Sequence, residues 1–169
     1  MNIEEAVNSG SVQDATADAS QYLTFIMDNE EYAVDILRVQ EIKGWDTATI
    51  LPNTPEYVRG VINLRGTIVP IIDLRQRFGL DTIEYGATTV VIVVKVMSET
   101  GHRIMGVVVD AVSEVYNVSL DNMKDAPSFG EIQKEVVKGL ATVDEKMIIV
   151  LDIDQLLSGQ DLSAVTSTQ

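Results

Sequence analysis

The feature that most constrains the fold of this chain is an internal repeat. Residues 58–74 align without a gap with residues 137–153, and both stretches read apolar–basic–Gly, a short apolar strand, a polar pair and an apolar run that reaches an aspartate. A shorter pair of segments, 34–42 and 109–115, repeats upstream of them. Because such a repeat marks a recurring structural unit, the chain is expected to fold as two similar β-rich modules in tandem.

The strands that the sequence predicts are short and often interrupted. Glycines at 60, 66, 106 and 139 punctuate them, and Pro70 falls inside the apolar run 68–72. Such interruptions are typical of small closed barrels, so the predicted fold class is all-β. Helical signal is weak, although Asp73 and Asp152 can each cap a short helix.

The repeat also predicts the domain boundaries. The first module is expected at about 22–80 and the second at about 89–157, with a connector at 81–87 between them. An acidic tail at 1–21 and a polar tail at 158–169 flank the modules. Modules this small bury little surface alone, so the two should share an interface, and the groove between them is the expected concave site.

Composition narrows the class of partner. The net charge of −14 argues against nucleic acid and anionic lipid as partners, because both are bound by basic patches. It favours a protein partner with a basic face. The chain has no cysteine, which excludes disulfides and thiolate metal sites. The acidic start lacks a signal peptide's apolar region and the apolar runs are too short to span a bilayer, so a soluble, intracellular protein without membrane insertion is expected.

Signals for catalysis are missing. His102 is the one histidine and falls in a predicted hairpin turn, so a solvated loop residue is the favoured interpretation. With one histidine and no cysteine, Cys–His catalysis and common zinc sites are excluded. The glycines around Arg65 lack the Lys-Ser/Thr of a phosphate loop, and no Gly-x-Ser-x-Gly elbow occurs. The chain is therefore predicted not to be an enzyme and to carry no cofactor or metal.

Arg65 is the charged residue that the repeat singles out. It precedes a glycine in the first copy, where the second copy has Asp144. One interpretation is a solvated turn arginine; the other is an arginine at the inter-module groove whose planar fork binds a carboxylate or a carbonyl. Glu41, in the segment 39–42, is the candidate internal partner, although it can equally be one more acidic surface residue.

Several apolar residues are candidates for either core or contact surface. Five valines lie in apolar strands, where a core position is the commoner outcome: Val39, Val90, Val91, Val112 and Val115. Phe129 differs because it lies in a loop rich in Pro, Ser and Gly. Such an aromatic can anchor a partner, or it can fold back as a lid on the second module.

The sequence resembles the CheW family of bacterial chemotaxis coupling proteins. The resemblance covers about residues 22–157 and is carried by 30–42 (EEYAVDILRVQEI), 53–55 (NTP), 59–66 (RGVINLRG), 68–75 (IVPIIDLR) and 106–115 (GVVVDAVSEV). It implies two intertwined five-stranded SH3-like β-barrels. It also implies a stand-alone, non-catalytic adaptor that joins the hairpin tips of chemoreceptors to the regulatory domain of the histidine kinase CheA. Such an adaptor is cytoplasmic and recruited to membrane-associated receptor arrays.

The resemblance also implies roles for single residues. Those implied on the receptor side are Glu41, Arg65, Val90, Val91, Val112 and Val115. Those implied on the kinase side are Val39 and Gly60, with Phe129 in a second kinase contact that closes rings in arrays. Two alternatives remain open: a small-ligand-binding β-barrel protein, and a fragment of the kinase's own regulatory domain.

Overall fold

The computed structural model describes residues 19–127 and 135–158 of the chain. Strands dominate it, which confirms the predicted all-β class, and the strands form two sheets. In chain order the elements are β1 (Ala19–Met27), β2 (Glu30–Asp35), η1 (Ile36–Arg38), β3 (Val39–Gly44), β4 (Val58–Leu64), β5 (Thr67–Asp73), α3 (Leu74–Arg77), β6 (Val90–Ser98), β7 (Gly101–Val109), β8 (Ala111–Ser119), η2 (Leu120–Asn122), β9 (Met123–Lys124), β10 (Val137–Val143), β11 (Lys146–Leu151) and α5 (Ile153–Leu156).

The sequence repeat is visible as a repeat of elements. Each half begins with a hairpin (β1–β2 or β6–β7), continues with a third strand (β3 or β8), and ends with a second hairpin (β4–β5 or β10–β11) followed by a short helix (α3 or α5). As predicted, an aspartate caps each helix: Asp73 accepts a hydrogen bond from the Gln76 amide, and Asp152 from the amides of Asp154 and Gln155.

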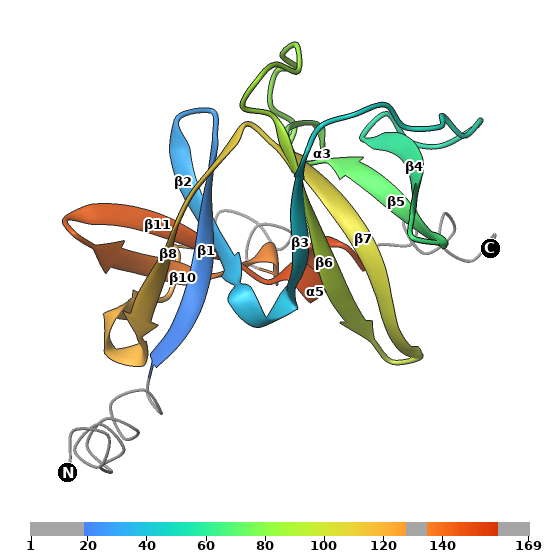
Figure 1. Ribbon diagram of the computed structural model, residues 1–169. Helices are drawn as coiled ribbons and strands as arrows, with labels where there is room; N and C mark the ends of the chain where they lie inside the picture. The colour runs from blue at the N-terminus through green and yellow to red at the C-terminus, as the bar shows by residue number, and fades with distance from the viewer. Residues whose placement is uncertain (1–18, 128–134, 159–169) are drawn as a thin grey trace, which may run out of the picture.

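The two halves exchange their first hairpins. The six-stranded sheet, on the left in Figure 1, has the order β8-β1-β2-β11-β10-β9, and the five-stranded sheet on the right has the order β3-β6-β7-β5-β4. The hairpin β1–β2 is thus paired with strands of the second half, and β6–β7 with strands of the first. The boundaries predicted at 22–80 and 89–157 therefore describe the repeat but not the barrels, because neither segment contains all the strands of one sheet.

The turns that join the second hairpins share one backbone conformation. Arg65 and Gly66 both have positive φ (51° and 91°), and Asp144 and Glu145 do as well (52° and 67°). Two consecutive residues with positive φ are the signature of a type I′ turn, whose twist matches that of paired strands. The Gly66 amide also donates to the side chain of Asn63 (2.7 Å). The repeat therefore places different side chains on the same turn.

Three apolar clusters hold the fold together. One lies inside the six-stranded barrel around Ala141 and Val150, and one lies inside the five-stranded barrel around Val69 and Val108. The largest contains residues of both sheets, including Phe25 of β1 and Ile92 of β6, and joins the barrels. A strand buried on both faces needs a continuous apolar run. This explains the run in β6, which alternates between the inter-barrel cluster and the cluster within its own barrel.

Candidate functional site

Arg65 forms an ion pair with Glu41, the candidate internal partner that the sequence offered. The Nη2 atom of Arg65 lies 2.5 Å from Oε1 of Glu41. Arg65 stands on the β4–β5 turn and Glu41 on β3, which is the opposite edge strand of the five-stranded sheet. The hydrogen bond from Arg65 holds the pKa of Glu41 below its usual value, so the carboxylate stays charged at neutral pH.

The pair is a surface feature, and its exposure limits what it does for stability. The Arg65 side chain is 73% exposed, whereas that of Glu41 is mostly covered. Exposed ion pairs contribute little to folding because water and salt screen them. A guanidinium carries five N–H donors, and the pairing with Glu41 uses one side of the fork. The arrangement therefore orients an arginine at the surface and leaves donors for a partner.

In the other barrel, the corresponding contact between the second hairpin and the third strand (here called the seam) has different chemistry. There, Lys146 follows the Asp144–Glu145 turn, and its Nζ atom lies 3.5 Å from the hydroxyl of Tyr116 on β8 and 3.7 Å from Glu31. Both barrels thus tie the second hairpin to the third strand by a polar contact. Only the five-stranded barrel places an arginine there.

Three of the singled-out valines lie at the junction of the barrels. Val39 on β3, Val90 on β6 and Val112 on β8 are half-buried and pack against the inter-barrel cluster. Val115, further along β8, has 46% of its surface exposed. These four side chains can contact a partner without unfolding either barrel.

Val91 does not share this position. It is 3% exposed and packs in the cluster inside the five-stranded barrel with Val69 and Val108. The role on the receptor side that the resemblance implied for Val91 stays a prediction, and the structure places its side chain in the core. Val90 and Val91 are adjacent, and neighbouring residues of a strand point to opposite faces.

Gly60 has a structural reason to be glycine. Its φ is +131°, and a Cβ added there would lie 2.2 Å from the carbonyl oxygen of Thr49. The backbone of Thr49 pairs with Val61 at this point, beside a register shift between β4 and β5. Gly60 itself is buried. Its implied kinase contact remains a prediction, and Phe129 lies outside the described residues.

Sequence reasoning missed two groups of charged residues between the barrels. Arg75 of α3 binds Asp28 and Asp110, and Asp154 of α5 binds Arg38. The sequence contained a signal for them: Arg75 and Asp154 each stand two residues after the capping aspartate of their repeat, so the repeat aligns two residues of opposite charge.

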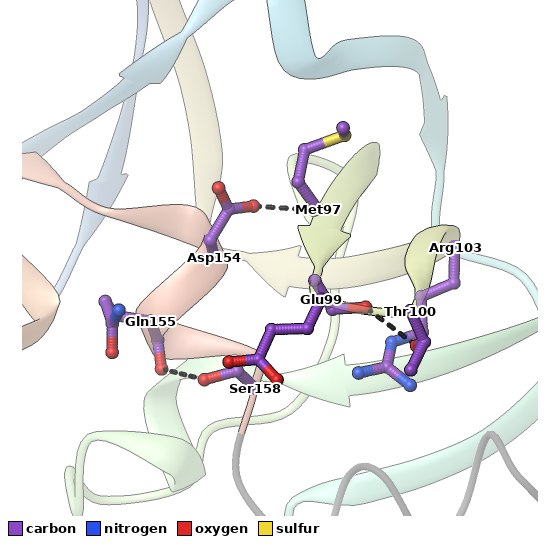
Figure 2. A pocket seen from close by; sticks show the side chains of 8 residues that line it. Met97, Glu99, Thr100, Arg103, Asp154, Gln155 and Ser158 are labelled. Atoms are coloured by element: carbon purple, nitrogen blue, oxygen red, sulfur yellow. Dashed lines mark hydrogen bonds between the residues drawn. The ribbon is translucent and has the colours of Figure 1, made fainter.

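A shallow pocket of about 590 Å³ lies between the β6–β7 turn and α5. Figure 2 shows Met97, Glu99 and Thr100 on one side of it and Asp154, Gln155 and Ser158 on the other. The polar groups here bind one another: the Met97 amide donates to Asp154 (2.7 Å), and the Ser158 hydroxyl to the Gln155 carbonyl (3.3 Å).

Two further observations concern the part of the chain that the structure describes. No group of three or more His, Asp or Glu side chains there is placed to hold a metal ion. No helix among those residues is long and apolar enough to cross a membrane.

The chain is similar to known chemotaxis proteins over most of its length. Residues 21–161 match the family model described as the CheW-like domain. The "Chemotaxis protein CheW" of Klebsiella aerogenes is 44% identical over 146 residues, which is 86% of each chain. The "Probable chemotaxis protein CheW" of Rhizobium etli is 33% identical over 145 residues, covering 85% of this chain and 91% of that one.

A solved structure agrees with these relatives. The "scaffolding protein TtCheW" from Thermoanaerobacter tengcongensis is 32% identical and superimposes with a TM-score of 0.76 over 84% of this chain and 94% of that one. This match confirms the pair of SH3-like barrels that the resemblance implied. The family match spans well over half of the chain, and the chain belongs to the family of CheW-like domains.

Proposed function

We propose that this protein is a non-catalytic adaptor that couples the cytoplasmic hairpin tips of chemoreceptors to the regulatory domain of the histidine kinase CheA. Its relatives are named as chemotaxis proteins, and the related solved structure is named a scaffolding protein. An adaptor needs separate contact surfaces on a body stiff enough to relate them. The two barrels, joined by a shared core and by ion pairs between them, supply such a body. The protein would act in the cytoplasm, at membrane-associated receptor arrays.

The observation that carries the proposal is the exposed Arg65 held by Glu41. A flexible arginine loses rotamer entropy when it binds, whereas one already oriented by a carboxylate loses less. A planar fork of N–H donors suits carboxylates and backbone carbonyls, which a helical hairpin tip presents at its turn. We assign Arg65 and Glu41 to the receptor side, together with Val90, Val112 and Val115 near the barrel junction.

The kinase side is assigned to the five-stranded barrel. Val39 stands at the start of the edge strand β3, and Gly60 lies on β4, the other edge. Edge strands have unpaired backbone groups that a partner sheet can use, except where Thr49 already pairs with Val61 beside Gly60. Phe129 is assigned to a second kinase contact. Because Val39 and Glu41 lie on the same strand, the receptor and kinase surfaces adjoin, which allows binding at one to affect the other.

The test is binding to a receptor tip and to the kinase regulatory domain, separately and together. The wild-type chain is expected to bind both at once. Arg65→Ala should weaken receptor binding and lower receptor-stimulated kinase activity, while binding of the kinase domain alone is retained. Lys146→Ala is the matched control, since it removes the equivalent seam cation of the other barrel.

A charge-exchanged pair separates two explanations for Arg65. If Arg65 acts only by bonding Glu41, the double variant Arg65→Glu with Glu41→Arg should restore coupling. If Arg65 itself binds the receptor, the double variant should stay defective. Our proposal expects the second result. Binding of neither partner by the folded wild-type protein would refute the adaptor function.

A further inference from the structure

The described chain passes between the two sheets twice, and a charged residue stands at each passage. The first passage is η1, which ends in Arg38 and leads from β2 to β3; the second is Asp110, between β7 and β8. Each of these side chains is bound by a residue from one of the short helices that end the repeats. The passages are the only covalent links between the sheets in residues 19–127 and 135–158.

The first contact, here called the Arg75 clasp, consists of Arg75, Asp28 and Asp110. Arg75 lies on α3, beside the five-stranded sheet, and its side chain is only 9% exposed. Its Nη2 atom lies 3.0 Å from Asp28, on the β1–β2 turn of the six-stranded sheet, and its Nε atom lies 3.4 Å from Asp110. The Asp28 amide also donates to Asp110 (3.0 Å). One buried guanidinium thus joins the tip of an exchanged hairpin to a passage.

The second contact, the Arg38–Asp154 clasp, mirrors the first. Asp154 lies on α5, which follows the six-stranded sheet, and it binds Arg38 through two hydrogen bonds of 2.5 and 2.7 Å. The same carboxylate accepts the amide of Met97 at the end of β6, and Arg38 donates to the Lys95 carbonyl (3.2 Å). Figure 2 shows Asp154 turned toward Met97. This clasp joins the other exchanged hairpin to the other passage.

The helix residues of the two clasps, Arg75 and Asp154, occupy equivalent positions of the repeat with opposite charge, and the passage residues Asp110 and Arg38 both lie between the first hairpin and the third strand of their half. The helix residue is arginine in the first and aspartate in the second, and the passage residue is aspartate in the first and arginine in the second. We propose that the two clasps fix the orientation of the barrels relative to each other, so that Arg75, Arg38 and Asp154 are positioning residues that make the two barrels move as one body. This inference does not depend on which partners bind.

Physical reasons favour this role over general stabilisation. The inter-barrel cluster is apolar, and apolar contacts are not directional, so they hold the barrels together without fixing a single angle. Hydrogen bonds between charged groups are directional, most of all when an arginine fork is used. Because the Arg75 side chain is shielded from solvent, salt screens its ion pairs less than those of a fully exposed pair. Each clasp also contacts both sheets, so it can fix one barrel relative to the other, whereas a contact within one barrel cannot.

The experiment measures the distance between the barrels in the full chain. The sequence has no cysteine, so His102→Cys on β7 and Thr142→Cys on β10 place one spin label on each sheet at exposed positions. Double electron–electron resonance should give one narrow distribution of the distance between the two labels in the otherwise unchanged protein. Arg75→Met should broaden it, and Arg75→Lys should do so less. Arg59→Met, which removes an arginine within the five-stranded barrel, is the matched control and should leave it unchanged.

Hydrogen exchange supplies a readout that a purely structural role would not give. Arg75→Met should speed amide exchange about tenfold in residues 19–35 and leave residues 58–73 unchanged. Arg38→Met should instead speed exchange in residues 94–104. Faster exchange spread evenly over all strands, or an unchanged distance distribution in both clasp variants, would overturn the proposal.

A milder variant covers the case in which Arg75→Met does not fold. Asp28 is 55% exposed, so Asp28→Asn removes one partner of the clasp without burying a new charge. Asp28→Asn should speed amide exchange in the same residues as Arg75→Met, but by a smaller factor. If it leaves the β1–β2 hairpin as protected as in the wild type, the clasp does not hold that hairpin and the proposal fails.

Discussion

Gly60 and Gly139 occupy the same point of the repeat, and each stands where a neighbouring backbone carbonyl approaches too closely for a side chain. A Cβ at Gly60 would lie 2.2 Å from the Thr49 oxygen, and one at Gly139 would lie 2.8 Å from the Lys124 oxygen. Both also fall at register shifts in their hairpins. In both barrels, therefore, a glycine makes room for a neighbouring segment that pairs with the strand beside it, Thr49 in one barrel and β9 in the other.

We predict that Gly60→Ala is the more harmful of the two substitutions. At Gly60 the obstacle is backbone and φ is +131°, a conformation that alanine rarely adopts, whereas φ at Gly139 is not positive. The expected loss is roughly 3 kcal/mol for Gly60→Ala and about half of that for Gly139→Ala. Urea denaturation of the purified variants measures both. Equal losses would contradict the role given to φ.

The expected loss of stability in Gly60→Ala can by itself reduce binding to a partner. A kinase-binding defect in Gly60→Ala is informative only if the variant is folded at the temperature of the binding assay. The melting temperature should therefore be measured beside binding. A folded Gly60→Ala protein that fails to bind the kinase domain would support the proposed contact.

Arg65→Ala should leave folding nearly unchanged. The arginine is exposed, and its ion pair with Glu41 is screened by solvent, so the melting temperature should shift by less than about 3 °C. Thermal melts monitored by circular dichroism measure this. A larger loss would show that the seam between β3 and β4 depends on the pair, and a coupling defect would then have a structural cause.

The repeat predicted the elements of the fold but not which strands pair. The hairpins β1–β2 and β6–β7 are similar, so local sequence does not state which barrel receives which hairpin. The resemblance implied intertwined barrels; the exchange itself appears only in the pairing of β1 with β8 and of β3 with β6. Pairing between distant segments depends on tertiary packing, which a repeat alone does not encode.

The candidate site was predictable to different degrees for different residues. The difference between the two copies singled out Arg65, whereas Glu41 was a candidate partner beside an open surface alternative. The sequence could not assign Val90 and Val91 to a face, because β6 is apolar on both faces and its unbroken apolar run shows no alternation between them. The Arg75 clasp was missed because its three members come from three separate loops and helices.

Acid should weaken the Arg38–Asp154 clasp. Burial alone would raise the pKa of Asp154, but the hydrogen bonds from Arg38 and the Met97 amide outweigh it and hold the pKa below its usual value. A carboxyl with a lowered pKa in the folded state contributes stability above its unfolded pKa and loses it as the pH falls through the folded value. The contribution should therefore be constant at neutral pH and fade below about pH 4.

The matching experiment compares Asp154→Asn with the wild type across this range. The variant should be about 1 kcal/mol less stable at neutral pH, since the pair is partly exposed, and the difference should shrink below about pH 4. Asp144→Asn is the control, because this exposed turn residue has positive φ, which asparagine tolerates. If the difference in stability between Asp154→Asn and the wild type grows as the pH falls, the predicted direction of the pH dependence is wrong.

Tyr85 should anchor the connector between the repeats through its hydroxyl. The hydroxyl donates to Asp73, the N-cap of α3, whose side chain is buried. Burial, followed by the hydrogen bond to Asp73, raises the pKa of Tyr85, so the hydroxyl keeps its proton at neutral pH. The ring also meets Trp45 edge-on, with centroids 4.7 Å apart.

Tyr85→Phe removes the hydroxyl and keeps these ring contacts. The expected cost is about 1–2 kcal/mol, because Asp73 loses one donor while it still caps Gln76. Tyr85→Ala should cost more, since it also removes the ring from Trp45, and it should change the fluorescence of that sole tryptophan. Urea denaturation followed by tryptophan emission measures both variants. Wild-type stability in Tyr85→Phe would show that the connector is held by the ring contacts alone.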